Sequence, residues 1–115
     1  MGCGRVSGTG APTSIRSELE AALSELPGLT RRPSRYGDGQ SFFVADREIA
    51  HFHGDHRLDV RLTRARIREL KTEGELDARV ITRGRTADWV EVALSRVEDI
   101  AFATLLVEDA IRANA

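Results

Sequence analysis

The stretch that decides the fold is residues 41–62, SFFVADREIAHFHGDHRLDVRL. It contains three short segments rich in aromatic and aliphatic residues, 41–45, 48–53 and 57–62, a composition typical of strands. In the last segment Leu58 and Val60 alternate with polar residues, so one side of that strand faces a core. The connections are so short that neighbouring strands must run antiparallel. The stretch therefore predicts a three-stranded meander.

Helices and further strands are expected on both sides of this meander. Ser14 is the expected N-cap of a first helix, Thr63 is that of a short middle helix, and Gly74 is the expected end of the middle helix. The expected elements outside the meander are a helix over 14–26, a strand near Thr30, a short helix over 63–73, strands over 78–82 and 89–94, and a helix over 96–112.

The C-terminal helix carries two further signals. Ser95 and Glu98 match the capping box S-x-x-E, in which each side chain bonds the other residue's backbone. The apolar spacing predicts that one stripe of this helix packs on the sheet. That stripe consists of Val97, Ile100, Thr104, Val107 and Ile111.

Together these elements predict an α+β fold with a single antiparallel sheet in meander order. Two amphipathic terminal helices lie on one face, and a short helix is inserted between strands. The 115 residues favour one domain, expected over 14–113 after a flexible N-terminal tail over 1–13. The second face of the sheet is expected to be open to water, unless the short helix or residues 31–39 cover it.

Composition narrows the function classes. The chain has 17 basic and 18 acidic residues and a net charge of -1, which weighs against bulk binding to nucleic acid or to an anionic membrane. No apolar run approaches the roughly 18 residues of a membrane span. The single cysteine, Cys3, cannot form an internal disulfide, which fits a cytoplasmic location. No known catalytic motif occurs, so the sequence predicts no catalytic residue and no cofactor, and favours a non-enzymatic role.

Three stretches of the sequence, residues 42–54, 58–62 and 88–92, resemble the luciferase-domain family of small bacterial proteins. The most specific piece is His-x-His-Gly at residues 51–54, followed by an alternating apolar strand. The resemblance covers residues 15–113. A weaker similarity in the order of elements links the chain to the MmcQ/YjbR-like proteins and supports the α+β class. Neither resemblance supplies a catalytic motif that transfers to residues of this chain.

The histidines suggest a transition-metal site. His51 and His53 are two residues apart on a predicted strand, so their side chains point to the same face. Imidazole nitrogens suit zinc, nickel, copper and iron. A third ligand could come from His56, Asp59 or Glu48. A small metal-dependent or histidine-dependent enzyme using His51 and His53 is therefore one alternative function.

Strand parity argues against Asp59 as that third ligand. If Gly54-Asp55 is a two-residue turn, His51 pairs with Leu58, and both His51 and His53 lie on the side of the core. Under this register the two histidines are polar residues at the edge of the core, away from Asp59.

The same parity places a different set of side chains on the open face. This set is Phe52, Asp59, Arg61, Trp89 and Glu91. A tryptophan beside an arginine and two carboxylates is an unusual surface, suited to a small ligand, a partner protein or a second copy of the chain. The favoured function is therefore a non-enzymatic ligand- or protein-binding module that self-associates.

A third alternative is nucleic-acid binding through the segment from Arg57 to Lys71. This segment holds six basic and two acidic residues, whereas Glu91 to Asp109 holds one basic and five acidic residues. No helix-turn-helix or known RNA-binding signature accompanies the basic segment. Pairing of its arginines with acidic neighbours is the favoured interpretation, and nucleic acid is an unlikely partner.

Overall fold

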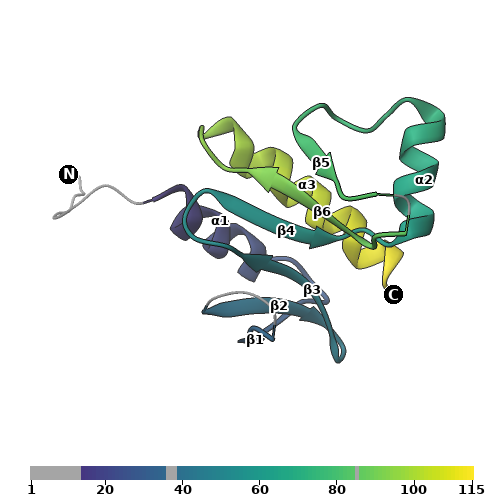
Figure 1. Cartoon of the computed structure of the whole chain (residues 1–115). Helices are drawn as coiled ribbons and strands as arrows, with labels where there is room; N and C mark the ends of the chain where they lie inside the picture. The colour runs from purple at the N-terminus through teal and green to yellow at the C-terminus, as the bar shows by residue number, and fades with distance from the viewer. Residues whose placement is uncertain (1–13, 36–38, 85) are drawn as a thin grey trace, which may run out of the picture.

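The computed structural model describes residues 14–35, 39–84 and 86–115, so the expected tail over 1–13 lies outside the described residues. One open six-stranded antiparallel sheet and three helices form the expected α+β fold (Figure 1). The helices are α1 (Ile15–Ser24), α2 (Arg64–Glu73) and α3 (Glu98–Ala113). The strands are β1 (Thr30–Pro33), β2 (Gln40–Val44), β3 (Arg47–Phe52), β4 (Arg57–Arg61), β5 (Val80–Thr82) and β6 (Trp89–Ala93). None of the helices in this described part is both long and apolar enough to cross a membrane.

The strand order is β1-β2-β3-β4-β6-β5, so the meander runs only through the first four strands. Helix α2 carries the chain past the position beside β4, and β6 returns to fill it. The apolar content of β5 and β6 explains why β6 is central and β5 lies at the edge. β6 buries Val90 and Val92 and suits a central place, whereas β5 is three residues long and exposes Ile81, so it suits an edge.

The core lies between the sheet and the two terminal helices, which pack together on the same side of the sheet (Figure 1). Leu58 and Val60 of β4 face Val92 and Val90 of β6, and all four side chains are completely buried. Ser14 caps α1 by accepting a hydrogen bond from the Ser17 backbone N–H, as expected. The caps expected for α2 are also present at Thr63 and Gly74.

The C-terminal helix differs from its predicted form. The side chain that bonds back to the preceding loop is Asp99 and not Glu98: its Oδ2 accepts from the backbone N–H groups of Ser95 (2.9 Å) and Arg96 (3.0 Å). The predicted stripe is correct at Val107, which is buried, and at Ile100 and Ile111, which pack partly buried against the core, but it is wrong at Val97, which is 63% exposed. The small side chains of Ala103 and Ala110 on the adjoining face allow the helix to approach the sheet closely. The residues that α3 buries are Asp99, Ala103, Leu106, Val107 and Ala110.

The register of β3 against β4 is one residue away from the predicted one. His51 pairs with Asp59 and Phe52 with Leu58. The His53 backbone N–H also bonds the Arg57 carbonyl oxygen at 3.0 Å, so three residues, 54–56, and not two connect the paired residues. Gly54 begins this connection with a φ of 69°, a conformation that glycine adopts without strain. A slip of one residue transfers every side chain to the opposite face. Phe52 is therefore in the core, and the prediction that it lies on the open face was wrong.

A β-bulge in β3 makes a second change of face. Phe42 pairs with Ala50 and Phe43 pairs with Glu48, which leaves Ile49 as the extra residue. Without a bulge, Glu48 and His51 would point to opposite sides of the sheet, because they are three residues apart. The bulge turns both side chains toward the face of the sheet opposite the two terminal helices, called the open face below, while Ile49 and Ala50 remain buried in the core.

The core can be tested with one buried and one exposed residue. Replacing Leu58, which is 0% exposed, with alanine is expected to lower the free energy of unfolding by about 2–5 kcal/mol, because a cavity remains. Replacing Ile81, which is 53% exposed on the edge strand, should change it by about 0.5 kcal/mol or less. Urea denaturation of both variants measures the difference, and equal losses would contradict this packing.

The Asp99 bonds predict a pH dependence. Hydrogen bonds from Ser95 and Arg96 lower the pKa of the Asp99 carboxyl although burial opposes them. Because the folded-state pKa lies below the unfolded value of about 3.9, the stabilisation is present above that pH and is lost as the pH falls toward the folded pKa. Asp99→Ala should therefore cost about 1 kcal/mol at pH 7 and less in acid. Glu98→Ala, at an exposed position, is the matched control, and an equal cost there would refute the assignment.

Candidate functional site

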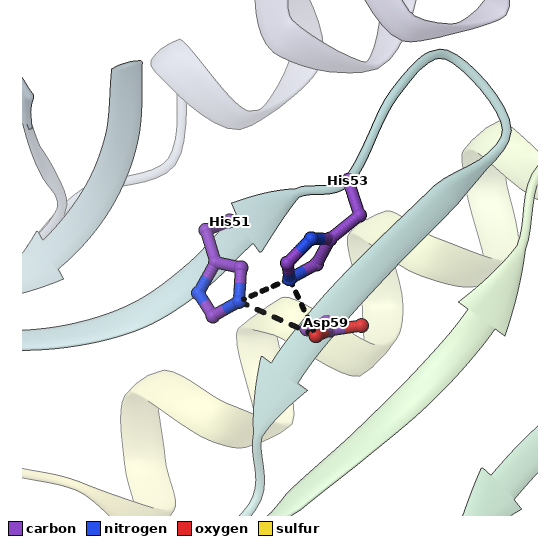
Figure 2. Close-up of side chains that lie close together, drawn as sticks. All are labelled: His51, His53 and Asp59. Carbon is purple, nitrogen blue, oxygen red and sulfur yellow. Dashed lines mark hydrogen bonds and ion pairs between the residues drawn. The ribbon is translucent and has the colours of Figure 1, made fainter. Parts of the chain in front are cut away.

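Two histidines and one aspartate meet on the open face of the sheet. His51 is on β3, His53 follows β3, and Asp59 is on β4. Nε2 of His51 lies 3.1 Å from Nε2 of His53 and 3.3 Å from Oδ2 of Asp59, and His53 Nε2 lies 3.1 Å from the same oxygen. Figure 2 shows both imidazole rings directed at this carboxylate. The three atoms form an almost equilateral triangle.

Asp59 is held in its ionised form. Its burial alone would raise the pKa, but hydrogen bonds from His51 and Arg57 and the positive charge of Arg57 outweigh burial and hold the pKa of Asp59 well below its usual range. The Arg57 guanidinium makes a two-pronged contact, from Nε to Oδ1 at 2.8 Å and from Nη2 to Oδ2 at 3.0 Å. Arg57 thus fixes the orientation of the carboxylate that both histidines approach.

The other ring nitrogen of His51 faces a second carboxylate. Nδ1 lies 3.1 Å from Oε2 of Glu48, which the bulge places on this face. Nδ1 of His51 and Oε2 of Glu48 are within ion-pair distance but not in hydrogen-bond geometry. Two residues that follow β1 hold Glu48 in place. Its carboxylate accepts hydrogen bonds from the Ser34 hydroxyl at 2.6 Å and from the Arg35 backbone N–H at 2.8 Å. Nε2 of His51 donates to Asp59 when it carries the ring proton; with the proton on Nδ1 instead, the lone pair of Nε2 points toward His53 and Asp59.

Further side chains surround the triangle. The Trp89 ring lies against the His51 ring, with centroids 4.7 Å apart. Glu91, opposite Asp59 on β6, forms ion pairs with Arg57 and Arg83. On the β2 side, Ser41 is the cross-strand neighbour of His51, and its buried hydroxyl oxygen has no hydrogen-bond partner among the residues described.

Exposure is uneven across the triangle. The side chain of His51 is 5% exposed and that of Asp59 is 10% exposed, whereas that of His53 is 38% exposed. His53 is therefore the most solvent-accessible member of the triangle, while the two other side chains are held within the sheet surface.

The arrangement needs a proton or a metal ion between its members. An ionised carboxylate and an imidazole nitrogen without a proton both present lone pairs, and lone pairs about 3 Å apart repel unless a proton or a metal ion lies between them. Ligand atoms bound to one metal ion at about 2.0–2.2 Å are themselves about 2.8–3.6 Å apart, from octahedral to tetrahedral angles. The separations of 3.1, 3.3 and 3.1 Å fall in that interval. The triangle can thus share protons or hold a metal.

Most of the predicted ligand-binding residues do share one face. Asp59 and Arg61 of β4 lie opposite Glu91 and Trp89 of β6, and Trp89 is half-buried beside His51. Phe52 is the exception, for the register reason given above.

Of the three predicted candidates for a third ligand, the structure places one beside both histidines. Asp59, which parity had disfavoured, closes the triangle with His51. His56 instead lies with Nδ1 3.2 Å from the Leu94 carbonyl oxygen. Glu48 contacts the far nitrogen of His51. Arg57 was not among the predicted site residues. Its position two residues before Asp59 on the same strand could have indicated it, because such residues point to the same face.

Half of the basic segment is paired with acidic residues of the same chain. Arg61 contacts Asp88 at 3.3 Å, and Arg66 contacts Asp109 at 2.9 Å. The second pair joins the basic segment to the acidic C-terminal part. Arg57 is occupied by Asp59 and Glu91, so half of the six basic residues in this segment have acidic partners.

Comparison with known proteins gives one match. The family model named Luciferase domain matches residues 46–110, which include the whole triangle, Trp89 and Glu91. No curated protein and no solved structure matches the chain, and nothing in the comparisons supports the weaker similarity to MmcQ/YjbR-like proteins. Because the matched region spans more than half of the 115 residues, the chain belongs to the luciferase-domain family.

Proposed function

We propose that this protein binds one divalent transition-metal ion through His51, His53 and Asp59 and presents it to a ligand on the open side of the sheet. The observation that carries the proposal is the triangle of three potential ligand atoms separated by 3.1–3.3 Å. Two imidazoles and one carboxylate, all on one side of the ion, leave coordination positions free. Such open sites are typical of catalytic zinc and of non-haem iron(II) centres.

The groups around the triangle support the proposal. Histidine ligands commonly donate their other ring N–H to a carboxylate, which fixes the tautomer and strengthens the ligand. The Glu48 carboxylate lies 3.1 Å from Nδ1 of His51, so a small rotation of either side chain would bring the two into hydrogen-bond geometry. Arg57 orients Asp59 through Oδ1 and also donates to Oδ2, the oxygen that faces the histidines, which leaves the second lone pair of Oδ2 for a metal ion. With neutral histidines, the three carboxylates of Glu48, Asp59 and Glu91 outnumber the guanidinium groups of Arg57 and Arg83, so the local field favours a cation.

The binding-module function remains a prediction, and a bound metal ion would change the roles of the residues predicted to bind the ligand. Asp59 would belong to the metal site, while Trp89 and Arg61 would border the ion's open side. Self-association through this face and a cytoplasmic location are still expectations from the sequence. Nucleic-acid binding by the segment from Arg57 to Lys71 is the least supported alternative, because Arg57, Arg61 and Arg66 already have acidic partners.

The metal site can be tested with cobalt and zinc. Untagged full-length protein, stripped with a chelator and carrying Cys3→Ser to remove the thiol, should bind one equivalent of Co²⁺ with a visible spectrum of mixed nitrogen and oxygen ligation. Zinc should compete for the same site and raise the melting temperature. His53→Ala should weaken zinc binding by more than about 100-fold, because loss of a supporting residue alone costs about 10–100-fold.

Two further variants separate ligation from simple histidine loss. His56→Ala removes the neighbouring histidine that lies outside the triangle and should leave zinc affinity unchanged. Glu48→Gln should weaken it by about 10-fold while keeping the stoichiometry at one. Equal effects of His53→Ala and His56→Ala, or no zinc binding by the folded protein, would refute the proposal.

A further inference from the structure

A second feature of the open face is a cleft of about 510 Å³ beside the triangle. Strands β2, β3, β4 and β6, the β2–β3 turn and the end of the chain contribute to it. The residues that line it are Arg35, Val44, Ala45, Asp46, Arg47, Glu48, Arg61, Trp89 and Asn114. This volume is in the range of pockets that hold small organic ligands.

Three arginines, Arg35, Arg47 and Arg61, line the cleft and make it basic. No hydrogen bond or ion pair engages the guanidinium groups of Arg35 and Arg47 within the part of the chain that the structure describes, although that of Arg35 lies over the Phe43 ring, 5.8 Å from its centroid. Arg61 is held between Asn114 and Asp88, which leaves it fixed in place. Free guanidinium groups bind carboxylates and phosphates through paired hydrogen bonds.

Three arginines and two carboxylates line the cleft, so the lining has a formal charge of +1. Both oxygens of Glu48 already accept hydrogen bonds, from Ser34 and from the Arg35 backbone. The Asp46 side chain is 97% exposed and pairs with Arg32, outside the cleft lining, at 3.6 Å. The cleft therefore offers net positive charge to a ligand.

The remaining lining is apolar. Trp89 and Val44 are both half-buried and border the cleft, so a ligand with an apolar body can cover them. A bare inorganic anion would leave this surface exposed to water. The lining thus favours an acid group joined to an apolar body.

The cleft and the triangle are neighbours on the sheet. His51, Asp59 and Glu91 form one cross-strand row, and Arg61 and Trp89 lie in the next row, two residues along the strands. Rows two residues apart are separated by about 7 Å. Glu48 and Trp89 belong to the cleft and also contact His51.

We infer that this cleft binds a small organic carboxylate, with its acid group on Arg35 and Arg47 and its apolar body on Trp89. The carboxylate site stands on the cleft alone. That its ligand approaches the metal ion rests on the proposed function, and the two can fail separately. The cleft then selects the class of ligand that the metal site receives.

The test uses Trp89, the single tryptophan, as the reporter in metal-free full-length protein. Three probes separate the recognition elements: benzoate has the acid group and the body, acetate lacks the body, and benzyl alcohol lacks the charge. Benzoate should change the Trp89 emission with saturation, and the other two probes should bind at least about 10-fold more weakly.

Matched arginine variants locate the site. Arg47→Ala should weaken benzoate binding by about 5–10-fold, as expected for a lost charge-assisted bond in an open cleft. Arg68→Ala removes an arginine of α2 that does not line the cleft, and should have no effect. Equal effects of the two variants, or equal binding of acetate and benzoate, would overturn the inference.

One double comparison separates this inference from the metal proposal. His53→Ala should keep benzoate affinity while it loses zinc, and Arg47→Ala should keep zinc affinity while it loses benzoate. Benzoate binding without any zinc binding would refute only the metal site. Zinc binding without saturable benzoate binding would refute only the carboxylate site.

Discussion

The pairing of β3 with β4 is the constraint on which the rest of the structure depends. Three connecting residues beginning at Gly54 set the register in which His51 faces Asp59. The same register directs Phe52 and Leu58 into the core, so the apolar and the polar face are fixed in one step. A connection shorter by one residue would bury the histidines and expose Phe52. Core stability and site geometry therefore cannot be varied independently in this hairpin.

The polar face has a composition that stability does not require. His51, Asp59 and Glu48 are nearly withdrawn from water on a sheet whose other face already supplies the core. Charged groups in such positions lose hydration, and well-packed apolar residues often serve stability as well or better. The chain instead gives these carboxylates hydrogen bonds: Asp59 accepts from Arg57, and Glu48 accepts from the Ser34 hydroxyl and the Arg35 backbone. Buried, mutually oriented ionisable groups of this kind are typical of functional sites.

The sequence was sufficient for the fold class and insufficient for the site. Alternation in residues 57–62 and the cap residues Ser14, Thr63 and Gly74 are local signals, and the structure contains each of them. The β3–β4 register and the bulge at Ile49 depend on how two strands pack together, and no local pattern specifies either one. One extra loop residue therefore reversed the predicted faces of His51 and Phe52. Asp59, Arg61, Trp89 and Glu91 were grouped correctly because their faces follow from alternation within β4 and β6.

The locality of the site explains how a chain of 115 residues can hold it. All three members of the triangle, and the carboxylate behind His51, come from residues 48–59, so a single hairpin brings them together. Strand residues are held by ladder hydrogen bonds, which makes such a site more rigid than one built on loops. The cleft arises differently, because β2, β4, β6 and Asn114 at the end of the chain must all converge to form it. Loosening of the C-terminal residues should therefore disturb the Arg61 side of the cleft, where Asn114 bonds both the guanidinium and the backbone of Arg61, before it disturbs the triangle.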